Sequence, residues 1–110
     1  MVPEGSVGDY VNAFERFRDP SHFRAWTLQE WRDALRRHGF AVAHEEQMGK
    51  TMEFSSWAGR HDATMQRLLR SMLAQTTPDV AASLAPQDQA GELTFRLIEG
   101  VFIARRADAA

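Results

Sequence analysis

Apolar side chains recur every three or four positions in several stretches of the chain, and the clearest of these stretches is residues 28–38. Thr27 and Glu30 stand three residues apart at its start, which is the spacing of a capping box. Gly39 follows it and suits the left-handed conformation in which many helices end. This pattern predicts a helix over residues 28–38.

Weaker patterns of the same kind predict four further helices. The first begins near Asp9 and ends at Asp19-Pro20, because a residue before proline disfavours the helical conformation. A short helix is expected over residues 54–59. The last two follow capping residues, Asp62 and Thr77, and in the second of them proline holds the first helical position.

Two stretches have the pattern of strands. Residues 40–44 are apolar and follow a helix end directly, and we expect this strand to stop at a break at Gly49-Lys50. Residues 93–105 alternate between apolar and polar at first, whereas Val101 to Ala104 are apolar on both faces. A strand of that second kind is typical of a sheet covered by helices on both sides.

These elements predict an α/β arrangement, or α+β for the chain by itself, with two long, mostly antiparallel strands and about five flanking helices. The chain is expected to form one domain over residues 1–110. Its parts are a helix and loop (1–26), a helix and strand (27–48), a helical insertion (53–85) and a C-terminal strand (92–105), followed by an irregular tail (106–110). Because two strands rarely form a stable sheet alone, a second copy or a partner chain is expected to complete it.

Composition narrows the function classes. Hydrophobic residues make up 44% of the chain and charged residues 25%, the net charge is −2, and cysteine is absent. Disulfides and thiolate metal sites are therefore excluded, and no basic surface suggests nucleic acid. No apolar run reaches the roughly 20 residues of a membrane span, and the N-terminus lacks the pattern of a secretory signal. We expect a cytoplasmic protein that binds neither nucleic acid nor membrane.

The best candidate for a site is the segment that carries His22, Arg24 and Trp26, whose side chains could contact a small-molecule substrate. The alternative is a loop histidine that bonds the backbone and fixes the entry to the next helix. The remaining histidines lack the spacing of metal ligands, so no metal site is predicted. The serines lack a nucleophile elbow, and no residue is assigned a catalytic role.

A stripe of methionine and leucine side chains follows Asp62, and it has two interpretations. Flexible methionines can pack over an apolar substrate, but a stripe at helical spacing is more often a core face. The stripe comprises positions 65, 68, 69, 72 and 73. Trp31 and Trp57 are likewise interpreted as core residues.

The run from Arg18 to Trp31, with its Asp-Pro-Ser-His loop and the capped helix that ends at Gly39-Phe40, is similar to class I S-adenosylmethionine-dependent methyltransferases of the ubiquinone/menaquinone-biosynthesis type. Trp57, the Thr77-Pro78 turn and the closing strand follow in the order expected of that family's C-terminal portion. Val2-Pro3-Glu4-Gly5 resembles the segment that leads into the family's active-site region. The resemblance covers nearly the whole chain.

The resemblance implies a partial Rossmann-like methyltransferase sheet, with S-adenosylmethionine as the cofactor of the full-length family. It also places the segment of His22, Arg24 and Trp26 near the substrate pocket. The family's glycine-rich cofactor turn is missing, so this chain is expected to bind no cofactor alone and to be inactive alone. Two alternatives stay open: a subunit of a split methyltransferase, and an interaction or small-ligand module that reuses the fold.

Overall fold

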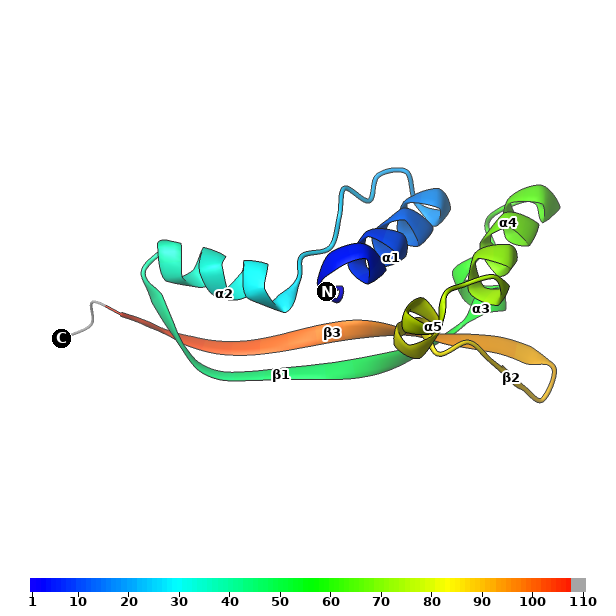
Figure 1. The fold of residues 1–110 in the computed structure, drawn as a ribbon. Helices are drawn as coiled ribbons and strands as arrows, with labels where there is room; N and C mark the ends of the chain where they lie inside the picture. Colours follow the sequence, from blue (N-terminus) through cyan, green and yellow to red (C-terminus); the bar gives the residue numbers. More distant parts are fainter. Residues whose placement is uncertain (108–110) are drawn as a thin grey trace.

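A pair of long antiparallel strands runs the length of the molecule, and the helices gather on it in two groups (Figure 1). The computed structural model describes residues 1–107, with principal extents of 56 × 27 × 24 Å. The radius of gyration is 16.4 Å, whereas a compact chain of this length is expected near 13 Å. The strand pair therefore extends well beyond the part that most of the helices cover.

Five helices and three strands make up the described part of the chain, and the sheet is antiparallel with the strand order β1-β3-β2. The elements are α1 (Gly5–Arg18), α2 (Leu28–Arg37), β1 (Phe40–Glu53), α3 (Phe54–Trp57), α4 (Ala63–Ala74), α5 (Pro78–Leu84), β2 (Gln87–Gln89) and β3 (Glu92–Arg106). The predicted fold class, with two long antiparallel strands and five helices, is confirmed.

The predicted break at Gly49-Lys50 is wrong, because β1 continues through it to Glu53. Gly49 lies opposite Ile98 in the ladder, and a Cβ atom built there would lie 2.2 Å from the Arg96 side chain. Glycine here makes room for a neighbouring side chain that crosses the strand. A glycine inside a strand can mark such a close approach as well as a break, and the sequence alone does not distinguish them.

The short strand β2 was not predicted. Gln87–Gln89 carries no apolar pattern, and it pairs with the start of β3 because of the turn between them. Ala90 and Gly91 both have positive φ angles, +54° and +83°. Two successive residues of that kind match the twist of a tight two-residue hairpin.

Helices α1, α3, α4 and α5 form the larger helical group, and they enclose an aromatic core. Phe14 of α1 stacks on Trp57 of α3 with ring centroids 4.6 Å apart, and Phe95 of β3 meets both rings edge-on at 5.4 and 4.9 Å. Leu69 and Leu73 of α4 are buried beside them. The core interpretation of Trp57 and of the inward part of the methionine and leucine stripe is therefore confirmed.

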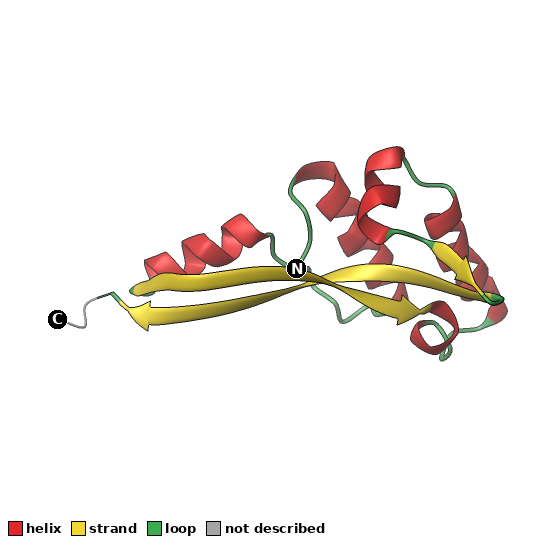
Figure 2. Cartoon of the chain, turned by 90° about the horizontal axis from the view of Figure 1, so that it is seen from below, coloured by secondary structure: helices red, strands yellow, loops and turns green. Residues whose placement is uncertain are grey.

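Helix α2 lies apart from the larger helical group, along the other end of the β1–β3 strand pair (Figure 2). Its Trp31 faces Phe102 of β3, with ring centroids 6.2 Å apart, but Trp31 stays 40% exposed. The prediction of Trp31 as a core residue is thus wrong for the chain by itself. A single amphipathic helix covers one side of two long strands incompletely.

The burial of the β3 side chains changes along the strand. Leu93, Phe95 and Leu97 face the larger helical group, as the alternating pattern predicts. Further along, Val101 and Ile103 are 44% and 55% exposed. The predicted burial of both faces is wrong for the described residues: Phe102 and Ala104 are only partly buried under α2, and no helix lies over Val101 and Ile103.

Helix ends follow the sequence closely. The capping box is complete, since the Thr27 hydroxyl accepts from the Glu30 N–H and the Glu30 carboxylate accepts from the Thr27 N–H, both at 3.1 Å. Gly39 has the predicted left-handed conformation, with φ of +84°. α1 differs at its start: it begins at Gly5, four residues before Asp9. Of the predicted tail, Arg106 ends β3, and positions 108–110 lie outside the described residues.

Candidate functional site

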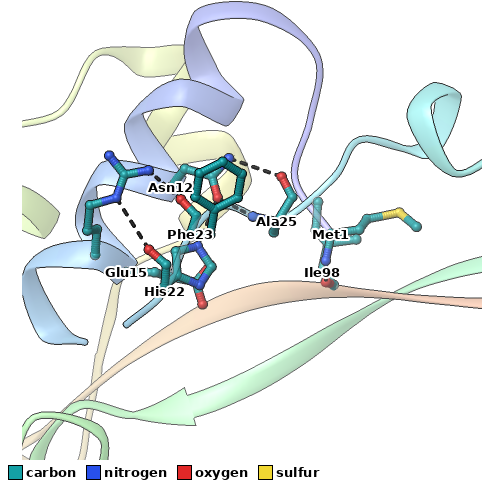
Figure 3. A network of polar contacts seen from close by, with 8 residues as sticks. Met1, Asn12, Glu15, His22, Phe23, Ala25 and Ile98 are labelled. Carbon is teal, nitrogen blue, oxygen red and sulfur yellow. Dashed lines mark hydrogen bonds and ion pairs between the residues drawn. The ribbon is translucent and has the colours of Figure 1, made fainter. Parts of the chain in front are cut away.

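The loop between α1 and α2 is held against α1 by one buried amide. The Asn12 side-chain oxygen accepts from the Ala25 N–H at 2.6 Å, and its NH2 group donates to the Ala25 carbonyl at 3.1 Å (Figure 3). Asn12 is only 9% exposed, and its two bonds to one residue reproduce the pairing of a strand neighbour. Buried amides that are paired in this way fix backbone position.

His22 belongs to the same network. Its Nε2 lies 3.0 Å from the Asn12 side-chain oxygen and 3.8 Å from a Glu15 carboxylate oxygen. Both atoms are acceptors, so the network assigns the proton to Nε2 and leaves Nδ1 as an acceptor in the neutral ring. Arg16 donates to the His22 carbonyl at 3.3 Å and to the carbonyl of Phe23. The side chains of Asn12 and Arg16 therefore hold the loop against α1.

A turn at Asp19 starts this loop. Its carboxylate accepts from the Ser21 hydroxyl at 2.7 Å and from the Ser21 N–H at 3.0 Å. These two bonds, with smaller contributions from Arg60 and Arg18, hold the pKa of Asp19 below its ordinary value. The Asp-Pro-Ser segment of the sequence is thus a self-bonded turn that ends α1 and directs the chain back along it.

Arg24 faces the opposite way, toward α2. Its guanidinium makes a two-point ion pair with Glu30, with N–O distances of 2.9 and 2.5 Å. This pair, helped by the Thr27 backbone N–H, lowers the pKa of Glu30 to about 2. Glu30 therefore serves both the helix cap and the loop, and it stays charged across the neutral range.

Trp26 packs on Trp31, with ring centroids 5.0 Å apart and ring planes at 55°. Arg24 and Trp26 line a hollow of about 220 Å³ together with Glu30, Asp33 and Arg37 of α2. Its walls combine one indole ring with two cationic and two anionic side chains. The hollow is smaller and more charged than an ordinary small-molecule pocket, and two of its walls, Arg24 and Glu30, are paired with each other.

The structure brings two of the three predicted site residues together. Arg24 and Trp26 share the hollow, whereas His22 faces α1 and does not line it. The assignment of all three to substrate binding stays a prediction. The contacts of His22 match the alternative interpretation, in which a histidine fixes the loop.

Sequence reasoning missed Asn12 and Phe23. Asn12 stands among the apolar residues of α1, and a polar residue on an apolar helix face signals a buried partner. Phe23 is 81% exposed although its own carbonyl is held by Arg16. A single exposed apolar side chain is ordinary on a protein surface, so Phe23 by itself marks no site.

No group of three or more possible ligand side chains that could hold a metal occurs in residues 1–107. In the same range no helix combines the length and apolar character needed to cross a membrane. The glycines with positive φ angles, Gly5, Gly39 and Gly91, lie at the start of α1, after the end of α2 and in the turn before β3.

Comparison with known proteins places the fold. No protein-family model matches the sequence, and no curated protein matches it. Solved structures do match in three dimensions, among them the following two. A candidate methyltransferase from Bacillus halodurans superposes with a TM-score of 0.85 at 23% identity, over 96% of this chain and 52% of its own. The YcgJ protein from Bacillus subtilis superposes with a TM-score of 0.81 at 22% identity, over 94% of this chain and 46% of its own.

The chain therefore has a methyltransferase-like fold. It spans about half the length of each solved structure that it matches. Identities of 22–23% establish the fold and leave the chemistry to be argued from the residues.

Proposed function

We propose that this chain forms the substrate side of an S-adenosylmethionine-dependent methyltransferase related to the ubiquinone/menaquinone-biosynthesis group. The observation that carries the proposal is the superposition of 96% of the chain on about half of a candidate methyltransferase. The order of the loop, capped helix and closing strand, which resembles that group, supports the narrower assignment.

The loop between α1 and α2 suits a role on the acceptor side of such an enzyme. A methyl acceptor must be held in line with the sulfonium methyl group, so the enzyme's main task on the acceptor side is positioning. Asn12 and Arg16 fix the loop backbone, and the loop in turn carries Arg24 and Trp26 at the hollow against α2. Rigid support of that kind is what an acceptor pocket requires.

The residues present do not fit the cofactor itself. The glycines lack the strand-turn-helix setting that would cradle it. The proposal therefore assigns S-adenosylmethionine to a cofactor-binding half outside these residues, supplied by more of the same polypeptide or by a separate chain. This segment contributes the acceptor wall and no step of methyl transfer by itself.

Isothermal titration of the purified chain with S-adenosylmethionine tests whether the cofactor site lies outside these residues. No heat of binding is expected at cofactor concentrations up to about 1 mM, the weak end of ordinary ligand affinities. A micromolar dissociation constant for the chain alone would overturn the proposal, because it would place a complete cofactor site within these residues.

Photo-crosslinking in the native cell tests the function. Antibody against residues 1–110 is used to isolate the native protein after ultraviolet crosslinking with S-adenosylmethionine labelled in its methyl group. We expect label on a species that contains this chain and is longer than it, or on a second chain that purifies with it. Absence of label from both would contradict the proposal.

A further inference from the structure

The ring of His22 uses only one of its two nitrogens within the described residues. Nε2 lies 3.0 Å from the Asn12 side-chain oxygen and 3.8 Å from a Glu15 carboxylate oxygen, whereas Nδ1 has no hydrogen-bond partner in residues 1–107. In the same residues every fully buried side-chain nitrogen or oxygen has a partner. Nδ1 is therefore not enclosed in the interior, which agrees with a side chain that is 22% exposed.

The backbone of Ala25 determines which nitrogen of His22 carries the proton. Its N–H faces the Asn12 side-chain oxygen and its carbonyl faces the Asn12 NH2 group, so the orientation of that amide is fixed. The oxygen of Asn12 can only accept, so Nε2 of His22 donates to it. The neutral ring therefore presents the lone pair of Nδ1. Every atom that fixes this tautomer belongs to α1 or to the loop that follows it.

We propose that Nδ1 of His22 accepts the proton of a methyl acceptor that carries a hydroxyl group. The inference rests on the proposed function, and it names the class of acceptor, an alcohol or a phenol. The O–H bond breaks, the Nδ1–H bond forms, and the electron pair stays on the oxygen, which becomes the stronger nucleophile. The ring becomes a cation, and the Glu15 carboxylate on its Nε2 side compensates the charge.

Holding the loop does not require the ring of His22. Asn12 binds both backbone groups of Ala25, and Arg16 donates to the carbonyls of His22 and Phe23. These two side chains fix the loop backbone on their own. An orienting partner on one ring nitrogen and an available lone pair on the other is the arrangement of a histidine that acts as a base.

Nitrogen NMR of the histidine rings tests the tautomer in the unmodified chain. At about pH 8, where an imidazole is neutral, we expect the proton of His22 to be on Nε2. In an Asn12→Ala variant the acceptor is gone, and the two tautomers of His22 are expected to mix. A proton on Nδ1 in the unmodified chain would overturn the inference, because no lone pair would then be presented there.

Phenol and its methyl ether, anisole, test the preference for a hydroxyl group. The two probes are alike except that anisole has no O–H to donate. With phenol up to about 10 mM, the weak end of ordinary ligand affinities, we expect the Nδ1 resonance of His22 to shift toward saturation. The shift should be at least fivefold larger than with anisole, and at least fivefold larger than that of His38, an exposed histidine at the end of α2.

His22→Gln is the matched variant, because it separates holding the loop from accepting a proton. The glutamine NH2 group lies near the position of Nε2 and can still donate to Asn12, but the side chain has no acceptor at the position of Nδ1. We expect the midpoint of urea unfolding to stay the same and the response of the loop amides to phenol to be lost. If this variant is less stable, the two probes in the unmodified chain still decide the question.

Equal shifts of His22 with phenol and anisole, or no shift with either, would overturn the inference. Its failure is distinguishable from that of the proposed function. Methyl label on a species that contains this chain, together with an unresponsive His22, would reject this inference alone. A responsive His22 without any label would reject the proposed function and leave the ring as a hydroxyl-binding group.

Discussion

The two ends of the long strand pair, β1 and β3, are built from the same two strands, yet helices cover them very differently. At one end α1, α3, α4 and α5 seal Phe95 among aromatic rings, and its exposed fraction is 1%. At the other end α2 alone lies against the sheet, and Ile103 of the same strand is 55% exposed. The comparison teaches that one strand can serve as core at its start and as a surface at its finish.

The difference has a physical cause in the number of layers. Burying a side chain in a sheet requires a layer on its own face, and the hydrophobic gain scales with the apolar area removed from water. The larger helical group provides such a layer for Phe95. No element in residues 1–107 provides one for Val101 and Ile103.

The largest expected effect is at the sealed end. Phe95→Ala removes a ring that meets Phe14 and Trp57, and we expect a loss of about 3–5 kcal/mol in the free energy of unfolding, measured in urea. Phe102→Ala is the matched control on the same strand, and its cost is expected to be less than half as large, because Phe102 is only partly buried. Equal costs would show that the two ends are equally well packed in solution.

A smaller effect is expected at the loop that joins the two ends. Asn12→Leu leaves the partly buried N–H and carbonyl of Ala25 without the Asn12 partner, which costs about 1–3 kcal/mol. The loop amides should also exchange faster with solvent. Ser21→Ala, which removes an exposed bond to Asp19, is the control and should change stability by no more than about 0.5 kcal/mol. A neutral Asn12→Leu variant would contradict the role given to this amide.

The pH dependence of the α2 end is expected to be smaller still, because Arg24 and Glu30 are both more than one-third exposed. The pKa of Glu30 is about 2 in the folded chain and 4.5 ordinarily. The folded state therefore favours the charged form, so its contribution to stability is complete above pH 4.5 and is lost as the pH falls toward 2.

Carbon NMR titration of the Glu30 carboxyl group measures this shift directly. In an Arg24→Gln variant the pKa of Glu30 is expected to rise toward its ordinary value. If the titration of Glu30 is the same in both proteins, the ion pair does not form in solution.

The smallest effect is expected on the open face. Ile103→Thr should change the free energy of unfolding of the dilute chain by no more than about 0.5 kcal/mol, since more than half of the side chain is already in water. Urea unfolding at micromolar concentration is the measurement. A cost of several kcal/mol would mean that this face is covered even in dilute solution, and the contrast between the two ends would then disappear.

Local signals in the sequence predicted local structure well. The capping box at Thr27, the caps at Asp62 and Thr77 and the glycine after α2 all depend on residues within one turn of each other, and the structure has each of them. The alternating start of β3 was correct for the same reason. The fold class followed from these elements in order.

Contacts between distant segments decided the features that the sequence did not predict: the full length of β1, the presence of β2 and the contacts of Asn12. β1 runs through Gly49 without a break. The glycine is there because the Arg96 side chain, 47 positions away, occupies the space that a Cβ atom would need. The two-residue turn at Ala90 creates β2 from a segment without a strand pattern. In the candidate site, Asn12 meets Ala25 and His22 only because the loop folds back on α1, a path that no spacing in the sequence encodes.

By itself, then, the sequence determined the capped starts of α2, α4 and α5, the end of α2 and the presence of the two long strands, because capping and periodicity act over a few residues. Only the tertiary structure decided which apolar residues are covered. Burial depends on which distant layer arrives at each face, so Phe95 and Ile103, equally apolar in the sequence, end as core and as surface.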